Sequence, residues 1–67
     1  MKLSARNQFN GTVTHITQGQ AMAEVTVKVG NLAVVAAITE GSVKGMGLKV
    51  NDSVTVAIKA TDVMVGK

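Results

Sequence analysis

Three short polar segments of this sequence contain the side chains best suited to hold a ligand. They are Ser4–Asn7, Thr39–Ser42 and Lys59–Thr61. Together they offer hydroxyl groups, a guanidinium group, an ammonium group and backbone N–H groups, with few hydrogen-bond acceptors. A dianion such as molybdate or sulfate carries only acceptors, so a site for it should consist of donors. The three segments therefore indicate an oxyanion-binding site.

The sequence lacks the residues from which an active site is usually built. It contains a single histidine, His15, no cysteine, and four carboxylates, none of them paired at a suggestive spacing. Acid–base and nucleophilic catalysis need such groups in matched environments. We interpret His15 as a histidine of the protein surface or of an interface. The sequence therefore predicts a binding protein rather than an enzyme.

The glycines of residues 41–47 do not make a phosphate-binding loop. The P-loop pattern needs Gly-Lys followed by Ser or Thr, at the start of a helix that follows a parallel strand. Here Lys44 precedes Gly45, and no strand–helix–strand pattern surrounds them. We interpret the segment as one helical turn that Ser42 caps and the two later glycines end.

Length and composition predict one small domain, residues 1–67, that associates with itself. A chain of this size buries only about 60% of the surface that its unfolded form exposes. It has no cysteine for disulfides, yet 46% of its residues are hydrophobic, and its only aromatic residue is Phe9. One thin core of small side chains cannot easily bury so much apolar surface. We therefore expect further copies of the chain to cover the remainder.

Charge and hydropathy limit the partners and the compartment. The net charge of +3 favours anionic partners, but the basic residues are spread along the chain and do not demand nucleic acid. No apolar run approaches the roughly 18 residues that span a membrane. No apolar segment follows the basic residues of Met1–Arg6, so we expect no signal peptide. Together with the lack of cysteine, this predicts a cytoplasmic protein that has no membrane partner.

The spacing of apolar residues predicts an all-β domain. The clearest strand is Ala23–Val29, where apolar and polar residues alternate, and a Gly30-Asn31 turn connects it to Leu32–Ile38, which is apolar on both faces. Three more strands are expected at Phe9–Thr17, Ser53–Ile58 and Thr61–Val65. Gly11 interrupts the first of them as a bulge or a close backbone approach. Five strands and one helical turn predict a small OB-like barrel.

Six short motifs follow one another along nearly the whole chain, from about Leu3 to Val65. They are Ser4-Ala5-Arg6-Asn7, Gly11-Thr12-Val13, Ala23-Glu24-Val25, Ile38–Ser42, Gly47-Leu48 and Ile58–Val63. As an ordered set they resemble the molbindin (Mop) family of small cytoplasmic proteins that bind molybdate and tungstate. The resemblance implies a five-stranded OB-like barrel, a hexamer arranged as a trimer of dimers, and oxyanions held between subunits.

The resemblance also implies which residues bind molybdate or tungstate, with no organic cofactor and no bare metal cation. In a first type of site, shared across a dimer interface, one subunit supplies Ser4, Arg6, Lys59 and Ala60. The neighbouring subunit supplies Thr39 and Ser42. A second type of site, near threefold axes, corresponds to the first hairpin, at Gly19, Gln20 and Ala21.

The chemistry of the first type of site agrees with its proposed ligand. Arg6 and Lys59 together offset the two charges of the dianion, so burial leaves no unpaired charge. Ala60 contributes only its backbone N–H, whereas relatives with serine at this place would add a hydroxyl. Phosphate is partly protonated near neutral pH, and a site made only of donors leaves that proton without an acceptor. We therefore expect weak phosphate binding.

Two other functions are compatible with a small β-barrel. The first is an OB-type module that binds single-stranded nucleic acid, but such modules stack bases on exposed aromatic side chains, and this chain has only Phe9. The second is a structural subunit whose donors only cap its strands. That subunit would show no change in thermal stability when an oxyanion is added, whereas a ligand of the folded state stabilises it.

Overall fold

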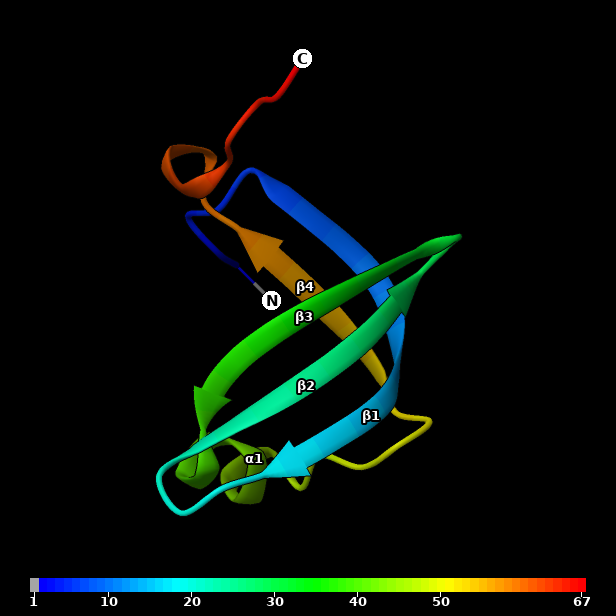
Figure 1. Ribbon diagram of the computed structural model, residues 1–67, viewed down its shortest axis with the longest axis vertical. Helices are drawn as coiled ribbons and strands as arrows, with labels where there is room; N and C mark the ends of the chain where they lie inside the picture. The colour runs from blue at the N-terminus through cyan, green and yellow to red at the C-terminus, as the bar shows by residue number, and fades with distance from the viewer. Residues whose placement is uncertain (1) are drawn as a thin grey trace.

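The structure is a computed structural model that describes residues 2–67 (Figure 1). Met1, the first residue of the expected domain, lies outside the described residues. The elements are β1 (Asn7–Gln18), β2 (Met22–Val29), β3 (Leu32–Thr39), α1 (Glu40–Met46), β4 (Ser53–Ile58) and a 3-10 turn, η1 (Ala60–Asp62). The strands form one antiparallel sheet in the order β3-β2-β1-β4. The expected all-β class with one short helix is confirmed.

The core lies between the sheet and α1 and consists mainly of valine. In β2, Ala23, Val25 and Val27 are buried, whereas the alternate residues face outward. Val13 of β1 and Val43 of α1 complete the fully buried cluster. This is the alternation expected of a strand with one buried face, and α1 covers part of the core that the sheet leaves open.

Strand β1 is long because it pairs with two different strands. Its first half, Asn7–Thr12, pairs with β4, and its second half, Thr12–Gln18, pairs with β2. Gly11 lies where β1 passes close to β2, since a Cβ atom at this position would lie 2.6 Å from Val27 Cγ1. The expected close backbone approach at Gly11 is confirmed. The irregularity of the ladder instead falls between Val13 and His15.

The fifth strand expected at Thr61–Val65 is wrong, and the barrel is not closed. After β4 the chain turns, because the N–H of Asp62 donates to the Lys59 carbonyl oxygen at 2.9 Å and so forms η1. The backbone of Val63 is extended, but this residue and those after it pair with no strand of residues 2–67. Met64 and Val65 are 94% and 95% exposed. In Figure 1 this red C-terminal segment leads away from the sheet.

The expected helical turn exists, but its caps differ from the prediction. The N-cap is Thr39, whose extended backbone (φ −71°, ψ 148°) ends β3 and whose hydroxyl oxygen accepts the N–H of Ser42. Ser42 is therefore the third residue of α1, inside its first turn and three residues after the cap. Gly47 ends the helix in the left-handed conformation, with φ 61°, as a C-terminal glycine typically does. No helix within residues 2–67 has the length and apolar character needed to cross a membrane.

Candidate functional site

A cavity of about 300 Å³ opens where the start of β1 meets the end of β4. It is lined by Ser4, Arg6, Lys59, Ala60 and Thr61. The structure thus brings together the four residues that the family resemblance assigns to one subunit's half of the first site. Thr61 is an addition. It belongs to the polar segment Lys59–Thr61, but the family resemblance assigns it no place in the site.

Strand pairing explains why residues from the two ends of the chain meet here. Asn7 and Ile58 are partners at the end of the β1–β4 ladder, and the Asn7 side-chain amide also donates to the Ile58 carbonyl oxygen at 3.1 Å. Arg6 and Lys59 are the next residues beyond this pair, so they flank the same opening. The Gln8 side-chain amide donates to the Ala5 carbonyl oxygen at 2.8 Å, which folds the N-terminal segment back toward the sheet.

The cavity is cationic, and its side chains are exposed. Two of its five lining residues, Arg6 and Lys59, carry positive charge, and none is a carboxylate. Ser4, Arg6 and Lys59 are all exposed in the isolated chain. Water therefore screens their charges. A second protein surface placed over the cavity would remove that water and strengthen the attraction between these charges and an anion.

Thr39 and Ser42 lie together at the opposite end of the subunit, where β3 leads into α1. In Figure 1, α1 is at one end of the molecule, and the dark-blue N-terminal segment and the orange 3-10 turn are at the other. The Thr39 hydroxyl donates to Ser42 Oγ at 2.7 Å, and the Ser42 N–H donates to Thr39 Oγ1 at 3.0 Å. The structure brings these two residues to each other but not to the cavity, so one chain does not assemble all six.

Glu40, between these two hydroxyl residues in sequence, departs from the pattern of donors. Its Oε2 atom is buried and has no hydrogen-bond partner within residues 2–67. Its backbone N–H donates to the Ala21 carbonyl oxygen at 2.9 Å, so the residue anchors α1 to the β1–β2 hairpin. This oxygen is therefore not accessible on the surface where Thr39 and Ser42 are exposed.

Replacing Thr39 with valine should destabilise the chain by about 1 kcal/mol even without any anion, since it removes the N-cap oxygen of α1. Thr39→Ser keeps the oxygen and should unfold like the parent chain. Thermal unfolding in anion-free buffer measures both. Equal melting temperatures for the valine and serine variants would contradict the capping role.

The residues expected at the second type of site form the tip of the β1–β2 hairpin. The Gly19 N–H donates to the Met22 carbonyl oxygen at 2.9 Å, and Ala21 and Gln20 are exposed. Because Met22 is the partner of Thr39 in the β2–β3 ladder, this tip lies at the same end of the subunit as α1. The three residues include no basic side chain, so one copy offers no positive charge to an anion at this tip.

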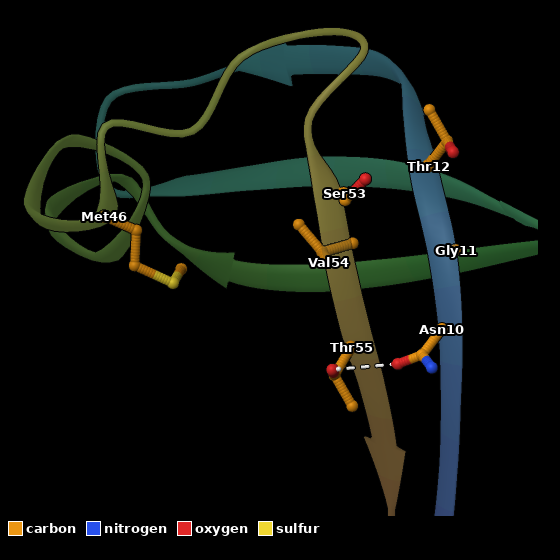
Figure 2. Close-up of a pocket in the computed structure, with 7 residues that line it drawn as sticks. All are labelled: Asn10, Gly11, Thr12, Met46, Ser53, Val54 and Thr55. Carbon is orange, nitrogen blue, oxygen red and sulfur yellow. Dashed lines mark hydrogen bonds between the residues drawn. The ribbon is translucent and has the colours of Figure 1, made fainter. Parts of the chain in front are cut away.

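A larger groove of about 590 Å³ runs beside β4. Figure 2 shows its lining, in which Met46 of α1 lies apart from residues of β1 and β4, and a hydrogen bond of 3.3 Å joins the Thr55 hydroxyl to Asn10 Oδ1. The lining residues are Asn10, Gly11, Thr12, Met46, Ser53, Val54 and Thr55. None is charged, so this groove lacks the cations that a dianion requires.

Comparisons with known proteins agree with this architecture. The family model described as the TOBE domain matches residues 3–65. The chain is 40% identical over 67 residues to a probable molybdenum-pterin-binding protein of Haemophilus influenzae, covering 98% of this chain and 97% of that protein. It is 38% identical over 66 residues to molybdenum-pterin-binding protein 3 of Clostridium pasteurianum, with 97% of each chain covered. The solved structure of a molybdate-binding protein from Sporomusa ovata superposes with a TM-score of 0.95 at 40% identity, and the match covers 100% of both chains.

Proposed function

The chain belongs to the TOBE-domain family, and within it to the molbindin (Mop) proteins. From that premise we propose that it binds molybdate, and by the same chemistry tungstate, at sites shared between copies of itself. The protein holds the oxyanion for storage or homeostasis and carries out no reaction on it. The proposal includes no organic cofactor.

The observation that carries this proposal is the cationic cavity. Two positive charges and two further donors line it without any carboxylate. That set suits a dianion, because its members can donate hydrogen bonds to the oxyanion and its two positive charges offset the two negative charges of the ligand. Phosphate is disfavoured, since its remaining proton finds no carboxylate to accept it. Nothing favours the nucleic-acid alternative, because Phe9 is the only aromatic residue available for stacking.

The other half of each site comes from a second copy. In one chain Thr39 and Ser42 are at one end and the cavity is at the other, so only two copies can bring all six residues to one anion. The second copy also supplies the cover that the exposed cavity lacks. Binding of the anion and association of the subunits are then coupled, so each strengthens the other.

Apolar surface on the isolated chain supports association as well. Leu32 and Val35 of β3 are 67% and 61% exposed, and Met46 of α1 is 63% exposed. An apolar hollow of about 240 Å³ remains between the sheet and α1, and it is lined mainly by valine, alanine, isoleucine and leucine. Both edge strands, β3 and β4, have free edges within residues 2–67. The apolar and exposed C-terminal residues Val63–Val65 of another copy are suited to cover this hollow.

We propose the assembly to be a hexamer, a trimer of dimers, formed by residues 1–67 as a single module. Two kinds of contact, one at dimer interfaces and one near threefold axes, then accommodate the two kinds of site, with Gly19, Gln20 and Ala21 at the second. The compartment proposed is the cytoplasm. The net charge of +3 is consistent with anionic ligands there.

Native mass spectrometry with and without sodium molybdate tests the proposal. The expected result is a species of six chains whose mass rises by several discrete molybdate increments. Sodium phosphate at the same concentration serves as the control and should add none. A monomer, or a six-chain species that gains no molybdate, would contradict the proposed function.

A further inference from the structure

Thr61 lines the cationic cavity but has been given no role by sequence or family resemblance. It stands next to Ala60, whose methyl side chain offers no hydrogen-bond donor. The two residues belong to the same 3-10 turn, η1, and both are exposed in the isolated chain. Within η1, the donors that line the cavity are therefore the Thr61 hydroxyl and backbone N–H groups, beside the ammonium group of the preceding Lys59.

The turn holds Thr61 at the cavity without using its hydroxyl. The Asp62 N–H donates to the Lys59 carbonyl oxygen at 2.9 Å, and the Val63 N–H donates to the Ala60 carbonyl oxygen at 3.4 Å. These bonds fix the backbone on both sides of Thr61. Its hydroxyl takes part in none of the side-chain hydrogen bonds within residues 2–67, so no protein group holds it in one rotamer.

We propose that Thr61 donates its hydroxyl proton to the bound oxyanion and so supplies the side-chain donor that Ala60 lacks. This inference rests on the proposed function and deepens it by naming a residue that sets affinity. An oxyanion between Arg6 and Lys59 presents oxygens with several free lone pairs. The hydroxyl can rotate toward one of them, because no protein acceptor competes for its proton. The resulting bond is charge-assisted, and such bonds are among the stronger ones in proteins.

Isothermal titration with sodium molybdate measures the effect in the intact assembly. Thr61→Val removes the hydroxyl and keeps the shape, so it should weaken molybdate affinity by about tenfold, as expected for one hydrogen bond to a charged group. Thr61→Ser keeps the hydroxyl and should bind like the parent chain. The matched control is Thr17→Val, since Thr17 is also an exposed threonine but lies in β1 and outside the cavity.

A compensating variant separates a ligand contact from a merely structural role. Adding Ala60→Ser to Thr61→Val puts a hydroxyl back on the same turn, one position earlier, and should restore most of the lost affinity. All variants should melt at the parent temperature in anion-free buffer. A Thr61→Val chain that melts earlier, with no recovery of affinity in the double variant, would overturn the inference in favour of a structural role.

The same titrations distinguish failure of this inference from failure of the proposed function. If the parent chain binds no molybdate, the proposed function itself is wrong. If the parent binds, Arg6→Ala does not, and Thr61→Val binds as tightly as the parent, then the cavity is the site but Thr61 is not a ligand, which overturns the inference.

Discussion

Replacing Arg6 with alanine should weaken molybdate binding by at least about 30-fold, the lower end of the loss seen when one partner of a buried charge pair is removed. Arg6 is one of only two cations that line the cavity. Without it, the dianion keeps one uncompensated charge when a second copy covers the site, and burial of such a charge is costly. Isothermal titration measures the loss, and native mass spectrometry should show fewer molybdate increments, because those of the cavity site are lost.

Two comparison variants show whether the geometry and position of Arg6, rather than its charge alone, account for the loss of affinity. Arg6→Lys preserves the charge but loses the planar fork of donors, so its affinity should fall between those of the parent and the alanine variant. Lys49→Ala removes the same unit of charge from an exposed turn outside the cavity and should leave binding unchanged. If Lys49→Ala weakened binding as much as Arg6→Ala, general charge rather than the cavity would account for the affinity.

Replacing Gly11 with alanine should destabilise the fold by about 3 kcal/mol, near the upper end of typical costs of overpacking. The new Cβ atom would lie 2.6 Å from Val27 Cγ1 and 2.7 Å from the Lys28 carbonyl oxygen. The second of these atoms belongs to the backbone of β2, so the clash cannot be relieved by rotating a side chain. For a domain of this size the loss is a large share of the total stability, which is about 0.05–0.15 kcal/mol per residue.

Gly45→Ala is the matched control for this prediction. Gly45 lies inside α1, and a Cβ atom there would meet nothing within 4 Å. Alanine should therefore stabilise the helix by up to about 1 kcal/mol, because it loses less backbone freedom on folding than glycine. Thermal and urea unfolding measure both variants. A Gly11→Ala chain as stable as the parent would show that β1 can move away from β2 at this position.

Most of the sheet could be predicted from the sequence, because each strand carries its own local signal. The alternation of apolar and polar residues in β2 and the glycine turn at Gly30 depend only on neighbouring residues. The missing closing strand could not be predicted in the same way. Val63–Val65 is as apolar as a strand should be, but whether it pairs within its own chain depends on the 3-10 turn before it, where the backbone bond between Asp62 and Lys59 redirects the chain.

The candidate site, too, could be predicted only in part. The family resemblance named Ser4, Arg6, Lys59 and Ala60, and the structure places all four around one cavity. The helix cap was assigned to Ser42 rather than Thr39, because the sequence does not mark the residue at which β3 ends and α1 begins. Thr61 was missed as a cavity residue for a similar reason. In a regular strand after Lys59 it would alternate in direction with its neighbours, whereas the 3-10 turn brings three consecutive residues to one wall.

The division of β1 between two partners has a consequence for synthesis on the ribosome. Its second half can pair with β2 once residue 29 has emerged, since a short hairpin joins them, and β3 can follow at once. Its first half must wait for β4, more than forty positions later, and contacts of such sequence separation form slowly. During that interval the nascent chain exposes an unpaired edge from Asn7 to Thr12. Gly11, whose side chain is a single hydrogen, and the polar residues Asn7, Gln8 and Asn10 make this unpaired edge a poor template for pairing with another chain.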